Sequence, residues 1–178
     1  VVTTASSWTS PAANPTVAVQ VGFVARAVNL INGGDVSGCG AEQHGVAGDL
    51  DCGDQVVVDF NQAVDHASGP AGADTVCAYG ASGTLWLGST ITTGACSATE
   101  TVSLGRLTGG TLGQCDCRFA AAYGWSADHQ TLTVTLGARL AGTGYPSLSG
   151  GPWTFTPTAD AARLLSSASG IHICDSSD

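Results

Sequence analysis

Short runs of alternating apolar and polar residues, separated by turn-forming residues, extend along most of the chain. The strongest run is Gln55–Asp65, in which Val56, Val58 and Phe60 share one face because side chains alternate along a strand. A polar Asn61-Gln62 pair ends the apolar part, and a Gly/Pro-rich stretch follows it. We expect this strand to be a central member of a β-sandwich, with the other runs packed around it.

Similar runs predict about nine strands in all. Their expected positions are 16–28, 55–60, 74–79, 84–87, 100–107, 117–123, 131–136, 153–156 and 171–174. The one helical candidate is Thr158–Ser169, with Thr158 as its cap, an apolar face that includes Leu164 and Leu165, and Gly170 at its end. Short strands divided by turns favour an all-β sandwich, here with one short C-terminal helix.

Two long loops are expected, at 29–54 and 137–151, and a tight turn at 125–130. A loop as long as 29–54 is functional or held by a cross-link, and it contains Cys39 and Cys52, so we expect these two to pair. Cys77 and Cys96 flank the next hairpin and form a second expected bridge. One of Cys115 and Cys117 is expected to pair with Cys174. The chain has seven cysteines, so at least one thiol is left over if every bridge lies within the chain.

Charge excludes several classes of partner. The 178 residues carry a net charge of −9, with five arginines and no lysine. The arginines are scattered, so no basic patch is expected, and neither nucleic acid nor anionic lipid is a predicted partner. Without lysine, Schiff-base chemistry and lysine cross-links are excluded. No apolar run approaches the roughly 20 residues of a membrane span.

The cysteines also predict a cellular setting, because disulfides persist in oxidising compartments. The chain contains no Met, which predicts that Val1 is an end left by removal of a signal peptide. We therefore expect a secreted or cell-surface protein.

Two segments resemble bacterial immunoglobulin-like domains of surface-layer and secreted proteins. One is V-V-V-D-F-N-Q-A-V-D with the Gly/Pro loop and D-T-V that follow, and the other is W-S-A-D-H-Q-T-L-T-V-T-L-G with the later W-T-F-T-P. The resemblance covers roughly residues 55–157. It implies an immunoglobulin-like fold and a structural or adhesive surface role, and it implies no particular ligand. The cysteines, the expected helix and the N-terminal arm depart from that family.

Candidate metal ligands are few. Asp49, Asp51 and Asp54 have a spacing that suits Ca²⁺, but no bidentate Glu follows as in a helix–loop–helix calcium loop. A solvated turn is the competing interpretation and the one that we favour. Cys115-Asp116-Cys117 lacks the second cysteine pair of a zinc site, and no haem-attachment motif occurs. No metal or cofactor is predicted.

The catalytic candidates are equally sparse. The four histidines are His44, His66, His129 and His172, and none belongs to an H-x-H or H-E-x-x-H motif. G-x-S-x-G is absent, which argues against one large class of serine hydrolases. We do not expect an enzyme.

The N-terminal arm, Val1–Pro15, carries the functional hypothesis, and residues 16–178 form the predicted sandwich domain. The arm is either an edge strand of its own domain or a strand donated to a neighbouring copy, with Val1, Val2 and Trp8 as contact residues. The second interpretation predicts a secreted structural subunit that assembles head-to-tail into a filament, pilus or surface layer. The alternative is a monomeric module that binds carbohydrate or cell wall.

Overall fold

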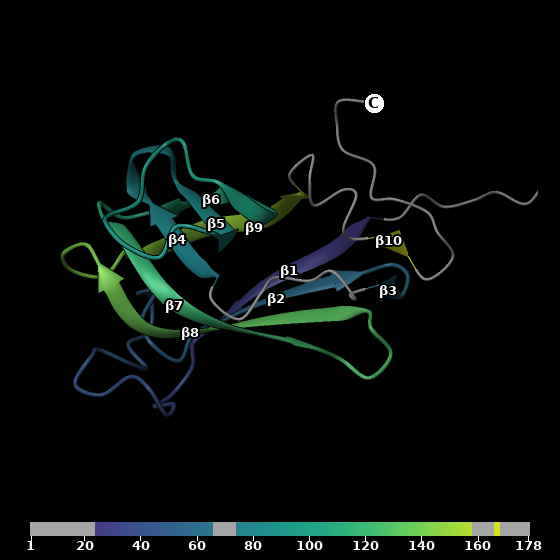
Figure 1. Cartoon of the computed structure of the whole chain (residues 1–178), viewed down its shortest axis with the longest axis horizontal. Coiled ribbons are helices and arrows are strands. Elements are labelled where there is room, and N and C mark those ends of the chain that lie inside the picture. The colour runs from purple at the N-terminus through teal and green to yellow at the C-terminus, as the bar shows by residue number, and fades with distance from the viewer. Residues whose placement is uncertain (1–23, 66–73, 158–165, 168–178) are drawn as a thin grey trace, which may run out of the picture.

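The computed structural model describes residues 24–65, 74–157 and 166–167, and this part of the chain is all-β (Figure 1). Its only helical element is the single 3₁₀ turn η2, Gly80–Ser82. The strands are β1 (Ala25–Ile31), β2 (Gln55–Phe60), β3 (Val64–Asp65), β4 (Thr75–Tyr79), β5 (Thr84–Ser89), β6 (Val102–Leu112), β7 (Asp116–Trp125), β8 (Thr131–Ala141), β9 (Leu148–Pro157) and β10 (Ser166–Ser167).

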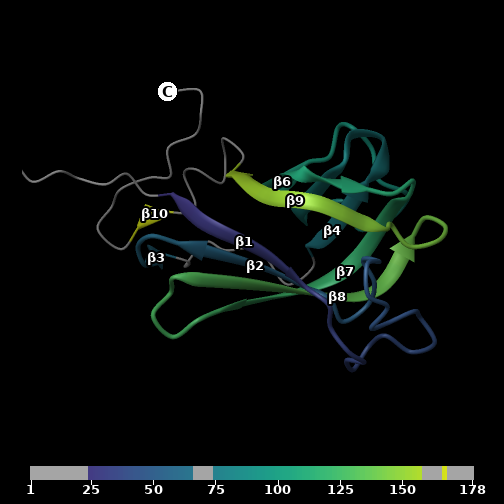
Figure 2. The same ribbon diagram turned by 180° about the vertical axis from the view of Figure 1, so that it is seen from behind.

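Eight strands form one antiparallel sheet in the order β1-β2-β8-β7-β4-β5-β6-β9, and β3 pairs separately with β10. The sheet curls round until its edge strands β1 and β9 lie next to each other, although no strand pairing joins them (Figure 2). Within it, β4, β5 and β6 follow as neighbours and β7 returns beside β4, which is the Greek-key arrangement.

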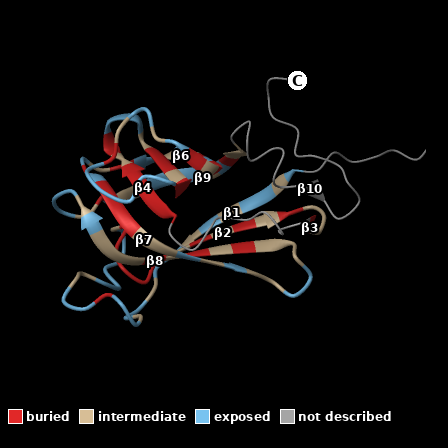
Figure 3. Cartoon of the chain, in the orientation of Figure 1, coloured by how far each residue is buried: buried red, intermediate tan, exposed pale blue. Residues whose placement is uncertain are grey.

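The inward-facing residues of this curled sheet form one core. Val56, Val58 and Phe60 of β2 are buried, as the sequence pattern predicts, while the residues between them are half-buried (Figure 3). Phe60 contacts Phe155 of β9 edge-to-face, with ring centroids 6.1 Å apart, and Trp125 of β7 at 5.9 Å. Side chains from both halves of the sheet therefore meet around β2. In the strand order, however, β2 is next to the edge strand β1, so its expected central place among the strands is wrong.

The chain passes from β6 to β7 through Gly113, Gln114 and Cys115, which cross the end of the β4–β5 hairpin. Gly80 donates its backbone N–H to the carbonyl of Cys115 at 3.1 Å. A Cβ at Gly80 would lie 2.6 Å from the carbonyl oxygen of Gly113, so only glycine permits this approach.

The all-β prediction is confirmed, but two finer expectations are wrong. The eight main strands form one continuous sheet, whereas an immunoglobulin sandwich has two separate sheets. The expected loop 137–151 is mostly strand, because β8 continues to Ala141 by pairing with β7 and β9 begins at Leu148. Of the glycines that suggest a loop, Gly137, Gly150 and Gly151 lie within strands, whereas Gly142 and Gly144 lie in the connection.

The expected C-terminal helix is wrong at its two described residues. Ser166 and Ser167 form strand β10, paired with β3, since their backbone groups bond across to Val64 and Asp65. The remainder of that helix, the strand at 171–174, the first part of the strand at 16–28, and the arm with Val1, Val2 and Trp8 lie outside the described residues.

Candidate functional site

The β5–β6 connection, residues 90–101, is fixed to the outer side of the sheet. In the ladder, Cys77 of β4 is paired with Trp86 of β5 on one side and with Arg118 of β7 on the other. A disulfide joins Cys77 to Cys96 of the loop, which confirms this predicted bridge. Cys77 and Arg118 are both 0% exposed although they lie on the outer side, which shows that other groups cover them.

Arg118 is the centre of a buried hydrogen-bond network. Its Nη2 lies 2.8 Å from Oε1 of Glu100, and its Nη1 lies 3.2 Å from Oε2. The two side chains are 0% and 1% exposed. Arg118 also donates to the backbone carbonyls of Ile91 and Gly94 and to the hydroxyls of Thr75 and Ser89. The guanidinium therefore holds both ends and the middle of the loop.

Glu100 is ionised in this network. Burial raises its pKa, but hydrogen bonds from Arg118 and Ser89 and the charge of Arg118 outweigh burial, so its pKa lies below the ordinary value. Ser89 donates to Oε2 at 2.6 Å and the backbone N–H of Ser97 donates to Oε1 at 3.1 Å. A buried pair with its polar atoms satisfied in this way is a structural brace.

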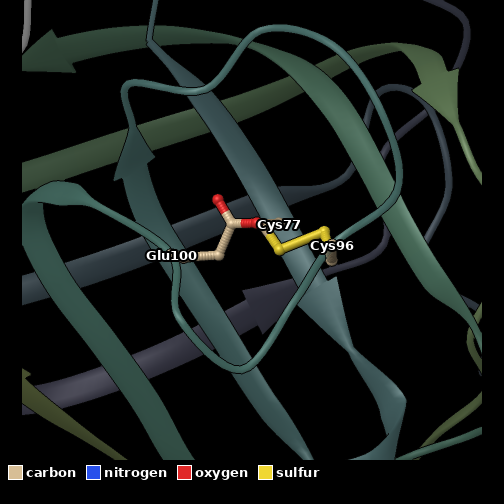
Figure 4. A group of neighbouring side chains, drawn as sticks. All are labelled: Cys77, Cys96 and Glu100. Carbon is tan, nitrogen blue, oxygen red and sulfur yellow. A yellow bond between two sulfur atoms is a disulfide. The ribbon is translucent and has the colours of Figure 1, made fainter.

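Within the described part of the chain, Cys77, Cys96 and Glu100 form the one group of three potential metal ligands (Figure 4). These residues do not fit a cation. The two sulfur atoms are bonded to each other, and the carboxylate is held by the Arg118 guanidinium. A divalent ion would have to displace a buried positive charge.

The second candidate is the 32–54 loop, closed by the predicted Cys39–Cys52 disulfide, which is confirmed. Asp51 is 0% exposed, and its two carboxylate oxygens accept backbone N–H groups of Gly45 and Val46, each at 3.0 Å. Asp54 is 3% exposed and accepts N–H groups of Gly33 and Asp51, each at 2.8 Å. These buried carboxylates hold the loop backbone in its conformation by accepting its N–H groups.

Hydrogen bonds within the loop account for the positions of the three aspartates whose spacing suits Ca²⁺. Burial raises the pKa of Asp54, helped by the charges of Asp51 and Asp49 and opposed by its two backbone hydrogen bonds. Asp49 accepts the amide of Gln43 at 2.9 Å. Each of the three carboxylates already accepts hydrogen bonds from the protein. The interpretation as a solvated turn is also wrong for Asp51 and Asp54, because both are buried.

A third cluster joins this loop to the β8–β9 connection. The Tyr145 hydroxyl donates to Glu42 and accepts the backbone N–H of Gln43, the latter at 3.0 Å. Arg139 lies over the Tyr145 ring at 4.4 Å and within 3.5 Å of Glu42. Burial and the bond to Glu42 raise the pKa of Tyr145. The cluster connects the 32–54 loop to the β8–β9 connection at a half-exposed position, and we interpret it as a structural contact.

The cysteine pairing differs from the expectation at one point. Cys115 pairs with Cys117 in the described structure, and Cys174, the expected partner of one of them, lies outside the described residues. Cys115 ends the β6–β7 connection and Cys117 is the second residue of β7, so the pair is local in sequence. The three disulfides indicate an oxidising environment.

The histidines are separated in the fold. His44 lies in the 32–54 loop, where its Nδ1 is 3.0 Å from the carbonyl oxygen of Glu42. His129 lies in the β7–β8 turn with φ +57°. His66 and His172 lie outside the described residues.

The free edges of the sheet differ in character. β9 contains Pro152 and Pro157, and Gly150 and Gly151 with positive φ, all of which interrupt strand pairing. β1 reads A-R-A-V-N-L-I, with no proline or glycine and with Arg26 as its one charged residue. Val24 before it and Ile31 at its end are 42% and 46% exposed. Of the two described edges, β1 is therefore the one that proline and glycine do not interrupt, and we call the junction between β1 and β9 the seam.

Comparison with protein-family models, with curated proteins and with solved structures found no match. The part of the chain that the structure describes contains no helix with the length and hydropathy needed to cross a membrane.

Proposed function

We propose that the protein is a structural subunit of an extracellular assembly, in which copies of this chain join head-to-tail. Each copy would add its arm, Val1–Pro15, as a strand at the seam of the next. The observation that carries the proposal is the seam itself, where, among the described residues, two sheet edges lie side by side without pairing and one of them, β1, contains no proline or glycine. An added strand would hydrogen-bond to the backbone groups on the edge of β1 that pair with no described strand.

Supporting features concern the stability of the subunit. The disulfides and the Arg118–Glu100 pair fix its long connections to the sheet. A subunit that transmits force between neighbours needs connections that do not open locally.

The arm would also supply side-chain specificity. Trp8 has the largest apolar side chain of the segment, and buried aromatic residues dominate the energetics of interfaces. Because donor and acceptor surfaces differ, the contact is heterologous and propagates into a fibre or closes into a ring.

The competing hypothesis is a monomeric module for carbohydrate or cell wall. Such a module would display aromatic rings together on one surface. Among the described tryptophans, Trp125 and Trp153 pack against the core, and Trp86 is half-buried beneath Arg106, with 5.9 Å between the guanidinium carbon and the ring centroid. This placement favours the structural role.

Competition with a free arm tests the proposal. A synthetic peptide of Val1–Pro15 is added in excess to the full chain, and particle size is followed by light scattering. The peptide should shorten the assemblies, whereas a control peptide with Val2 and Thr4 replaced by proline should leave them unchanged, because it cannot complete the ladder. Equal effects of the two peptides, or a full chain that stays monomeric throughout, would refute strand donation.

A further inference from the structure

The sequence contains one Asn-Gly pair, Asn32-Gly33, which directly follows the last residue of β1. Packing requires glycine at position 33, because a Cβ there would lie 1.8 Å from the carbonyl oxygen of Gly53. The Asn32 side chain is exposed, and its amide nitrogen makes only a long hydrogen bond, 3.4 Å, to the carbonyl oxygen of Gly45. The side chain can therefore turn toward the backbone nitrogen of Gly33, and no side chain on that residue obstructs it.

The backbone N–H of Gly33 faces a buried carboxylate. It donates a hydrogen bond of 2.8 Å to Oδ1 of Asp54, whose Oδ2 accepts the N–H of Asp51. Asp54 is 3% exposed, and burial raises its pKa, which makes the carboxylate a stronger base. A base within hydrogen-bonding distance of an N–H can take its proton as the nitrogen forms a new bond.

We propose that Asn32 is a site of self-catalysed covalent modification, with Asp54 as the general base. The Gly33 nitrogen attacks Cγ of Asn32 and forms a C–N bond, while its proton passes to the Asp54 carboxylate. The Cγ–Nδ2 bond then breaks, and the NH₂ group leaves as ammonia with the proton that Asp54 received. The product is a five-membered cyclic imide, and its formation consumes no oxidant, cofactor or partner.

Water then opens the imide at one of its two carbonyl groups. One opening leaves aspartate at position 32, and the other leaves isoaspartate, in which the backbone runs through the side-chain carbon. Either product adds a negative charge to a chain whose net charge is −9. Isoaspartate also lengthens the backbone by one atom where Gly33 packs against Gly53 without room for an added carbon. This product should therefore lose the hydrogen bond from Gly33 to Asp54.

The other described asparagines lack this combination. Asn29 lies within β1 and is followed by Leu30. Asn61 accepts the backbone N–H of Val24 at 2.9 Å through its side-chain oxygen and is followed by Gln62. A side chain on the following residue hinders closure of the five-membered ring. Asn29 and Asn61 are therefore internal controls in the same chain.

The kinetics of the oxidised full chain test the inference. The chain is incubated beside a synthetic peptide of residues 27–38, which contains the Asn-Gly pair without Asp54. Peptide mass spectrometry measures conversion of Asn32, and hydroxylamine, which cleaves a chain at a cyclic imide, reports the intermediate. Conversion should be at least about tenfold faster in the folded chain than in the peptide. Equal or slower conversion in the folded chain would overturn the proposal.

The pH profile separates the carboxylate from hydroxide in solution. In the peptide, the rate should rise in proportion to hydroxide concentration. In the folded chain, the rate should level off above the pKa of Asp54, because the base is then fully ionised; the other charges that act on Asp54 are those of Asp51 and Asp49. A folded chain whose rate follows hydroxide as the peptide does would assign the proton transfer to solvent and not to Asp54.

A matched pair of variants identifies the base. Asp54→Asn should reduce conversion of Asn32 to the peptide rate or below, whereas Asp35→Asn, at an exposed position of the same loop, should leave it unchanged. Circular dichroism and mapping of the Cys39–Cys52 disulfide show whether each variant folds. Conversion at the native rate in folded Asp54→Asn would refute the role of Asp54. If Asp54→Asn does not fold, the pH profile of the native chain decides.

Discussion

Arg118 of β7 and Glu100 of the β5–β6 loop form a two-point ion pair that is almost completely removed from solvent, with a nearest N···O distance of 2.8 Å. Arg118→Met should destabilise the fold by about 3–5 kcal/mol, because it leaves the Glu100 carboxylate buried without its cation. Urea unfolding under oxidising conditions measures the change. Arg106→Met is the matched control and should cost less than about 1 kcal/mol, since Arg106 is exposed and stacks on Trp86.

Replacing both Arg118 and Glu100 tests whether the two side chains stabilise the fold as a pair. Arg118→Met with Glu100→Leu should recover much of the loss, because an apolar pair removes both buried charges. If the double variant were as unstable as the sum of the two single variants, the two side chains would not act as a pair.

The same pair gives stability a defined pH dependence. The pKa of Glu100 is lowered in the folded state from its ordinary value of 4.5. Its contribution is therefore complete above pH 4.5 and is lost as the pH falls through the folded-state pKa. The stability difference between the native chain and Glu100→Gln should be constant near neutral pH and narrow in acid. A stability difference that increased at acid pH would show that the folded-state pKa of Glu100 is not lowered.

The strands could largely be predicted from the sequence because alternation reports burial on one face. It located β2, β4, β5, β7 and the start of β8. It ended β8 too early at Gly137, where small residues continue the ladder against β7 without an apolar signal. The curling of one sheet and the seam depend on strand order, which local patterns do not encode.

The ion pair between Arg118 and Glu100 was not predicted from the sequence, for a similar reason. Its partner lies 18 residues away, and the contact exists only because the β5–β6 loop folds over the sheet. A signal was present nonetheless, since Arg118 stands inside the buried run C-R-F of a chain with few charges. The Cys39–Cys52 and Cys77–Cys96 pairs were predictable because each closes a local loop.

The Cys115–Cys117 disulfide leaves Cys174 as the cysteine without a partner in the same chain. Trypsin cleaves after Arg106, Arg118 and Arg163, so Cys115 and Cys117 should remain in one peptide, 107–118, carrying an internal disulfide. Cys174 should then be alkylated without reduction or be joined to Cys174 of another copy. Non-reducing peptide mapping makes the measurement. A peptide 107–118 joined to peptide 164–178 would contradict the Cys115–Cys117 pair.

Calcium should not stabilise the protein. The carboxylate oxygens of Asp51 and Asp54 accept backbone N–H groups within the 32–54 loop. Millimolar Ca²⁺ should leave the Tm unchanged, while Asp51→Asn should lower stability by about 1–3 kcal/mol, because an amide nitrogen would face a backbone donor. A Tm that rises with Ca²⁺ and no longer rises in Asp51→Asn would establish a calcium site.

Negative-stain imaging of the chain lacking Val1–Ser10 tests strand donation most directly, with circular dichroism to show that the variant folds. We expect ordered assemblies from the full chain and isolated particles from the shortened one, because the donor strand is gone while the seam remains. Assemblies of the same form and yield without Val1–Ser10 would contradict the account.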